Sequence, residues 1–119
     1  MPILDIRTYE IRPEKMRQWL DLWETFALPI QREICGDFLG MYVTEVGPVN
    51  EVVHLWRFAD MGEREARRAR MAADPRWQQY LEAQERLAAI RNANSRIVRP
   101  TAFSPFLQAL CTTSESSSP

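Results

Sequence analysis

Apolar and polar residues alternate along the first segment of the chain. Over residues 3–11, Leu4, Ile6 and Thr8 fall on one face and the residues between them fall on the other. A period of two is typical of a strand with one buried face. We therefore predict that the chain begins with a half-buried β-strand.

A different spacing follows, because apolar residues recur every three or four positions between residues 16 and 30. This pattern predicts one amphipathic helix. Pro29 lies inside it and lacks a backbone N–H, so we expect a kink or a restart near Leu28. The large members of the apolar stripe are assigned to the core: Trp19, Trp23 and Phe26.

Two further alternating segments, residues 38–46 and 51–58, flank a short stretch that contains glycine, proline and asparagine. Such residues are typical of turns between strands. The two segments are therefore predicted to pair as a β-hairpin.

Two helix starts follow the hairpin. Asp60 suits the N-cap of a helix over about residues 61–73, and Asp74 with Pro75 suits the cap and first turn of the next helix. A short last strand is expected over residues 95–99. The element order is then β-α-β-β-α-β, which predicts an α+β fold of the ferredoxin-like type with helices on one face of an antiparallel sheet.

The face of the sheet that points away from the helices decides what the fold can do. We expect Leu4 and Ile6, Leu39 and Met41, and Val53 and Leu55 to face the helices. The other face would then carry the aromatic and titratable side chains of the strands. Because so much aromatic surface is unfavourable in water, we expect a second copy to cover it and form a homodimeric α+β barrel. The side chains assigned to this lumen are Arg7, Tyr9, Tyr42, Thr44, His54, Trp56 and Arg96.

Length and charge narrow the possible functions. The 119 residues fit a single domain, placed at residues 1–107, with a polar tail at residues 108–119. A net charge of −1 argues against a nucleic-acid-binding protein. We expect no membrane span and, since no leader pattern precedes the first strand, a cytoplasmic location. One histidine and two distant cysteines argue against a metal site, and no cofactor motif is present.

The predicted lumen has the groups that acid–base chemistry needs. His54, the only histidine, could remove a proton from a carbon acid or phenol, with Tyr9 or Tyr42 donating a hydrogen bond to the developing enolate. Arg7 or Arg96 could hold an anionic group. Thr44 and Trp56 complete the ligand-binding set, because an indole can stack on a flat substrate.

Each of these residues also has a purely structural interpretation. His54 beside Trp56 fits a hydrogen-bonded packing residue, and the two tyrosines fit an interface. Arg7 and Arg96 fit ion pairs with Asp5, Glu45 or Glu51. The arginine-rich segment at residues 63–70 also contains glutamates at helical spacing, which favours a solvated helix face.

Several segments resemble the NIPSNAP family, over roughly residues 3–107. The resemblance implies a dimeric α+β barrel and little about chemistry, because small bacterial-type members have no assigned activity. Vertebrate members are associated with mitochondria, a role not expected here. The matching segments are Ile6-Arg7-Thr8-Tyr9, Leu28-Pro29-Ile30-Gln31-Arg32, the hairpin from Glu45 through Val46-Gly47-Pro48-Val49-Asn50 to Glu51-Val52-Val53-His54-Leu55-Trp56, Ala73-Asp74-Pro75-Arg76-Trp77 and Phe103-Ser104-Pro105.

Three functions remain open on the sequence. The first is a binder of a small apolar or aromatic, partly anionic molecule in the barrel. The second is a cofactor-independent mono-oxygenase, isomerase or cyclase that acts on an aromatic or polyketide-like substrate with His54 as general base. The third is a protein-interaction module that uses the helix surfaces and the chain from Pro100 onward.

Overall fold

The computed structural model describes residues 2–104, so the proposed domain boundary after residue 107 and the tail at residues 108–119 lie outside the described part of the chain. Within these residues, four strands and two helical stretches connect in the predicted β-α-β-β-α-β order. The elements are β1 (Ile3–Ile11), a 3-10 turn (Pro13–Lys15), α1 (Met16–Leu22), a π-helical segment (Trp23–Ala27), α2 (Leu28–Cys35), β2 (Phe38–Val43), β3 (Glu51–Phe58), α3 (Met61–Ala73), α4 (Pro75–Leu87) and β4 (Ile90–Val98).

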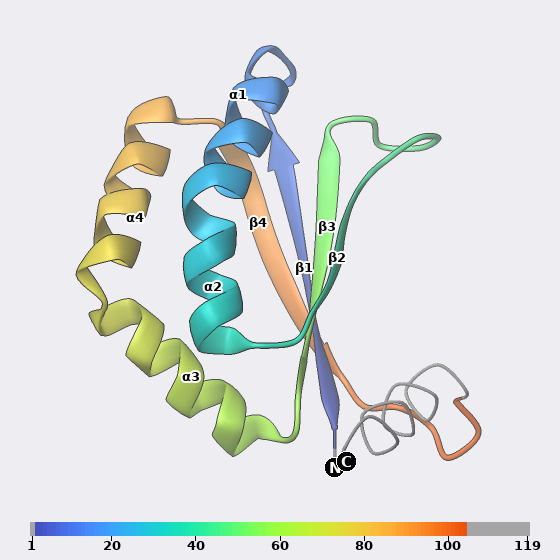
Figure 1. Ribbon diagram of the computed structural model, residues 1–119. Coiled ribbons are helices and arrows are strands. Elements are labelled where there is room, and N and C mark those ends of the chain that lie inside the picture. Colours follow the sequence, from blue (N-terminus) through green and yellow to red (C-terminus); the bar gives the residue numbers. More distant parts are fainter. Residues whose placement is uncertain (1, 105–119) are drawn as a thin grey trace.

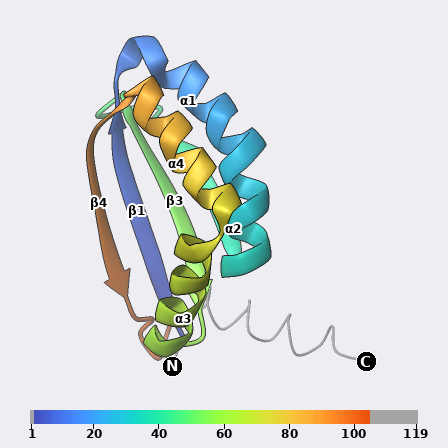
Figure 2. The same cartoon turned by 90° about the vertical axis from the view of Figure 1, so that its left-hand side faces the viewer.

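The strands form one antiparallel sheet in the order β2-β3-β1-β4 (Figure 1). The helices pack against the same face of this sheet, and no helix within residues 2–104 covers the opposite face, called the bare face below (Figure 2). The predicted ferredoxin-like α+β fold is therefore confirmed. Within the sheet, β1 and β3 are central neighbours, and their register places Arg7 opposite His54 and Asp5 opposite Trp56.

On β1 and β3 the sheet faces are the reverse of those predicted, whereas Met41 of β2 packs against the core beneath the helices as predicted. On β3, the residues buried beneath the helices are Val52, His54, Trp56 and Phe58, whereas Val53 and Leu55 lie half-buried on the bare face. The strands carry apolar residues at both parities, so alternation alone cannot distinguish the faces. Large rings fill the deep space below a helix layer, and the smaller aliphatic side chains are left on the bare face.

The first helix contains one wide turn. Leu28 donates its backbone N–H to the carbonyl of Trp23, five residues earlier, before α2 begins at Leu28 as the sequence predicts. The wide turn rotates Phe26 away from the sheet, and this side chain is 55% exposed. Its assignment to the core is therefore wrong, whereas Trp19 and Trp23 are buried as predicted.

The ends of the other elements follow local chemistry. Asp60 Oδ1 accepts the backbone N–H of Glu63 at 2.8 Å, and Asp74 Oδ1 accepts that of Arg76 at 2.8 Å, so both predicted helix caps are confirmed. β4 begins at Ile90, earlier than predicted, because its exposed polar residues resemble a loop although they pair along β1. Among residues 2–104, no helix combines the length and the apolar character that crossing a bilayer requires.

Candidate functional site

A cavity of about 260 Å³ lies between the sheet and the helix layer. Its volume is smaller than the roughly 300–1,000 Å³ that is typical of sites for drug-sized ligands. Four helical elements and the central strand β1 contribute to its wall, so the fold assembles it from distant parts of the sequence. The lining residues are Arg7, Tyr9, Trp23, Gln31, Arg68, Trp77, Tyr80, Leu81 and Gln84.

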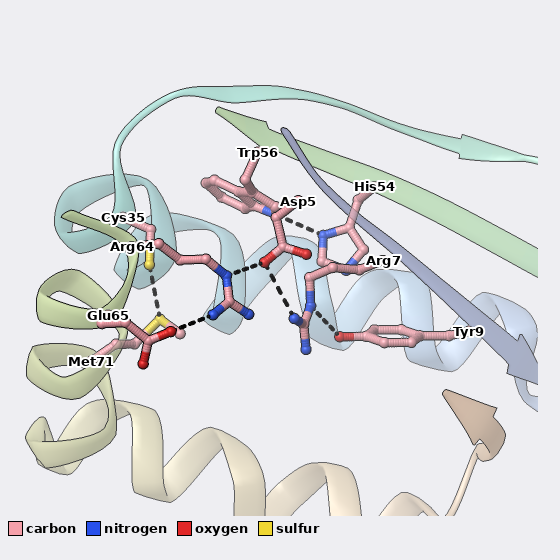
Figure 3. A network of polar contacts seen from close by, with 9 residues as sticks. All are labelled: Asp5, Arg7, Tyr9, Cys35, His54, Trp56, Arg64, Glu65 and Met71. Atoms are coloured by element: carbon pink, nitrogen blue, oxygen red, sulfur yellow. Dashed lines mark hydrogen bonds and ion pairs between the residues drawn. The ribbon is translucent and has the colours of Figure 1, made fainter. Parts of the chain in front are cut away.

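A buried carboxylate anchors the charged side of this cavity. Asp5, which is 1% exposed, accepts Arg64 Nε on Oδ2 at 3.0 Å and lies 3.5 Å from the Arg7 guanidinium. Figure 3 shows the two arginines reaching this carboxylate from opposite sides. Arg7 Nε also donates to the Tyr9 hydroxyl at 3.1 Å. The predicted ion pair between Arg7 and Asp5 is confirmed, and it fixes the guanidinium beside the cavity.

Arg68 adds a second guanidinium to the wall without a carboxylate to balance it. Within residues 2–104, it makes neither an ion pair nor a hydrogen bond. Burial, followed by repulsion from Arg7 and Arg64, lowers the pKa of Arg68. Arg68 remains a cation at neutral pH because an arginine pKa lies far above it. The cavity therefore has a surplus of positive charge.

The arginine-rich segment is not simply a solvated face. Arg64, Arg67 and Arg68 are half-buried, and their side chains turn toward the sheet or α2. The expectation of a solvated helix face is therefore wrong for these three residues. The signal was present in their spacing, because residues three or four apart share a helix face and this stripe leads to buried Met71.

Gln31 of α2 supplies an unusual polar group to the same wall. The side chain is 3% exposed, yet its amide has no hydrogen-bond partner in the described part of the chain. Sequence reasoning missed it as a site residue. The available signal was a polar residue four positions after buried Ala27, in the apolar stripe of the helix.

His54 lies behind the cavity wall, not in it. Its Nδ1 accepts Trp56 Nε1–H at 2.8 Å, so the neutral ring carries its proton on Nε2, which has no partner among residues 2–104. The rings of Tyr9 and Trp23 lie edge-on to the imidazole, with centroids at 5.2 and 5.4 Å. Burial, with repulsion from Arg7 and Arg68, lowers the pKa of His54 from 6.5 to about 3. This arrangement argues against His54 as a base at neutral pH.

The sequence-predicted site residues do not share one face. Arg7 and Tyr9 reach the cavity, and His54 with Trp56 supports its wall. The other three lie elsewhere: Tyr42, 58% exposed, pairs with Val53 on the bare face, Arg96 pairs with Ile6 there, and Thr44 follows β2 and donates to the Glu51 carbonyl. The seven residues therefore do not form a single lumen set. An exchange of the two faces alone would have kept them together. The register shift between Phe38 and Gly40 places Tyr42 on the opposite face from His54, and Arg96 pairs with Ile6 instead of Arg7.

The helix α4 contributes the apolar side of the cavity, which sequence reasoning also missed. The rings of Trp77 and Tyr80 lie 5.0 Å apart, and burial raises the pKa of Tyr80. The Tyr80 hydroxyl donates to Gln84 Oε1, which also accepts Trp19 Nε1–H at 3.4 Å. These contacts hold flat rings against the opening. No cluster of three or more His, Cys, Asp or Glu side chains arranged to hold a metal occurs within residues 2–104.

The sheet, its single helix layer and the cavity between them define a ferredoxin-like α+β domain with a small, positively charged internal site. A family model described as NIPSNAP matches residues 4–105. The chain therefore belongs to the NIPSNAP family, and the predicted resemblance is confirmed.

Solved structures and curated sequences support the same conclusion. A NIPSNAP family protein from Agrobacterium tumefaciens is 36% identical, with a TM-score of 0.83 over 88% of this chain and 98% of that chain. An uncharacterized NIPSNAP-like domain protein from Burkholderia xenovorans is 35% identical, with a TM-score of 0.80 over 87% and 89% of the two chains. The NipSnap homolog of Dictyostelium discoideum is 32% identical over 76 residues, which are 63% of this chain and 33% of that protein. The chain thus spans about a third of the length of this curated relative.

Proposed function

We propose that the protein binds a small, partly apolar anion in the cavity between the sheet and the helices. The observation that carries this proposal is the unpaired guanidinium of Arg68 in the cavity wall. The sequence placed such a ligand in the barrel between two subunits, whereas the charged and aromatic residues favour a site inside each subunit.

Local charge supports an anionic ligand. Three guanidiniums, those of Arg7, Arg64 and Arg68, gather around the buried carboxylate of Asp5. Hydrogen bonds between a guanidinium and a carboxylate are stronger than neutral ones, and a partly buried site screens them little. Burial, followed by repulsion from Arg7 and Arg64, lowers the pKa of Arg68, and a bound anion would offset that repulsion.

The remaining wall supports a flat or apolar body for the ligand. Trp23, Trp77 and Leu81 present apolar surface to the cavity, and the ring of Tyr80 lies tilted beside that of Trp77. Pockets of this composition combine apolar walls with a few polar groups that orient the ligand. A monocarboxylate with a planar ring fits both the charge and the small volume.

Replacing Arg68 with glutamine is expected to weaken benzoate binding by about 10- to 100-fold, since a hydrogen bond to a charged group contributes about 1.5–3 kcal/mol. Isothermal titration calorimetry measures the affinity. Benzamide, which has the same ring without the charge, should bind the wild-type protein poorly.

The matched control is Arg70→Gln, which removes the same charge from an exposed position of the same helix. It should leave benzoate affinity nearly unchanged. Equal losses in the two variants, or equal binding of benzoate and benzamide, would show that the cavity does not select for an anion through Arg68.

The two other functions have less support. An enzyme with His54 as base conflicts with the hydrogen bond to Nδ1 and the low pKa of the ring. A protein-interaction role for the C-terminal segment falls largely on residues outside the described part of the chain.

We also propose a homodimer in which two bare sheet faces pack together. The bare face presents Leu4, Ile6, Val53 and Leu55, all half-buried although no helix covers them, and the exposed ring of Tyr42. Two such faces would bury each other's apolar surface.

The variant Leu55→Lys places a charge in the middle of that face and is expected to convert the protein to a monomer. Size-exclusion chromatography with light scattering measures the mass. Ala66→Lys, on the exposed side of α3, is the control and should stay dimeric. A wild-type monomer, or a Leu55→Lys variant that remains dimeric, would contradict the proposed interface.

A further inference from the structure

The amide of Gln31 is the strongest unexplained feature of the cavity. It is nearly fully buried, lines the cavity with Arg7 and Arg68, and has no hydrogen-bond partner among residues 2–104. Within those residues, the side-chain atoms that are both sealed from solvent and without a partner belong to Asp5 and His54, so the unpaired polar atoms of Gln31 are not sealed from solvent. The amide therefore faces the cavity space.

No group of residues 2–104 pairs with this amide, so contacts within the protein do not explain why it is there. Buried polar groups in folded proteins nearly always have partners, because an unpaired one loses its hydrogen bonds to water without compensation. The neighbours of Gln31 in the helix stripe, Ala27 and Ile30, are buried and apolar. A leucine at position 31 would continue that stripe, so the amide is best explained by a ligand.

We propose, on the basis of the anion-binding function above, that Gln31 determines specificity by recognising a neutral hydroxyl or carbonyl oxygen on the ligand. An amide donates and accepts hydrogen bonds but carries no charge, so it suits a neutral polar group. Arg68 supplies the partner for the negative charge from the adjoining helix α3. The ligand class is then a hydroxy- or oxo-carboxylic acid with a flat apolar body.

The test compares benzoate with the ortho, meta and para hydroxybenzoates and with benzoylformate, all by isothermal titration calorimetry. The wild-type protein should bind at least one of the four oxygenated acids about 10-fold or more tightly than benzoate. A site that pairs with a substrate hydroxyl rejects the analogue that lacks it. In Gln31→Leu this preference should disappear, so that the oxygenated acids bind no more tightly than benzoate does.

A second measurement needs no ligand. The melting temperature of Gln31→Leu should be higher than that of the wild type, by about 4 °C or more, because the variant removes an unpaired buried amide from a small domain. Gln18→Leu, at an exposed position of α1, is the matched control and should shift little. A lower melting temperature in Gln31→Leu would show that the amide has a structural role and would overturn the proposal.

The outcomes separate this inference from the function on which it rests. If none of the five acids binds the wild-type protein, the anion-binding function fails and the specificity role fails with it. If benzoate binds through Arg68 but no oxygenated acid binds more tightly, or Gln31→Leu keeps the preference, the specificity role alone is wrong.

Discussion

Replacing Asp5 with alanine is expected to destabilise the fold by about 3–5 kcal/mol, which is the cost of leaving buried charges without their partner. Asp5 lies beneath the helices and balances Arg7 and Arg64 with a single oxygen. Without it, these two guanidiniums and that of Arg68 repel one another in a poorly solvated space. Urea unfolding followed by tryptophan fluorescence measures the free energy of unfolding.

Glu33→Ala is the control, since it removes the same charge from an ion pair with Arg76 at the exposed surface. Exposed ion pairs contribute little, so this variant should unfold nearly as the wild type does. Similar losses in Asp5→Ala and Glu33→Ala would show that the buried ion pairs do not organise the domain.

The second large effect is a pH dependence of stability. We expect His54 to lower the free energy of unfolding in mild acid. The pKa of His54 is about 3 in the folded protein and has its ordinary value of 6.5 in the unfolded chain. The unfolded state therefore binds one more proton between these values, and stability falls as pH is lowered from about 6.5 toward 3. The slope from this group approaches about 1.4 kcal/mol per pH unit. Above pH 6.5, His54 is neutral in both the folded and the unfolded state, and this loss of stability is absent.

Proton NMR measures this titration directly, because His54 is the only histidine and its ring signals need no assignment among others. Its chemical shift should stay constant from pH 8 to pH 5. His54→Asn keeps an acceptor for the Trp56 indole and should lose the acid slope in urea unfolding. A ring that titrates between pH 6 and 7 would contradict the buried, neutral state.

The order of elements was predictable because each carries a local signal. The alternation of β1, the aspartates that cap α3 and α4 and the helical restart at Leu28 are all matters of neighbouring residues. Local signals depend on backbone geometry and are therefore present in a single sequence. The start of β4 was missed because pairing with β1, and not its own composition, makes it a strand.

The candidate site was harder, because it depends on which sheet face the helices cover. Arg7, Tyr9, His54 and Trp56 were correctly grouped by parity, but they were assigned to the wrong face. Arg68 and Gln31 come from helices whose relative placement no local pattern specifies. Gln31 nevertheless breaks a rule in the sequence, since a polar residue in an apolar helix stripe conflicts with the local pattern, and such conflicts are expected at functional positions.

The π-helical segment Trp23–Ala27 has a consequence for how the cavity can vary between relatives. It is equivalent to one extra residue inserted into an α-helix, and each helical residue advances the side-chain direction by about 100°. Deleting one residue there would restore a regular helix but turn the two halves out of phase. Either Trp19 and Trp23 or Ile30 and Gln31 would then turn away from the buried positions that they occupy. The length of this segment is thus a constraint on the cavity as strict as the identity of any side chain that lines it.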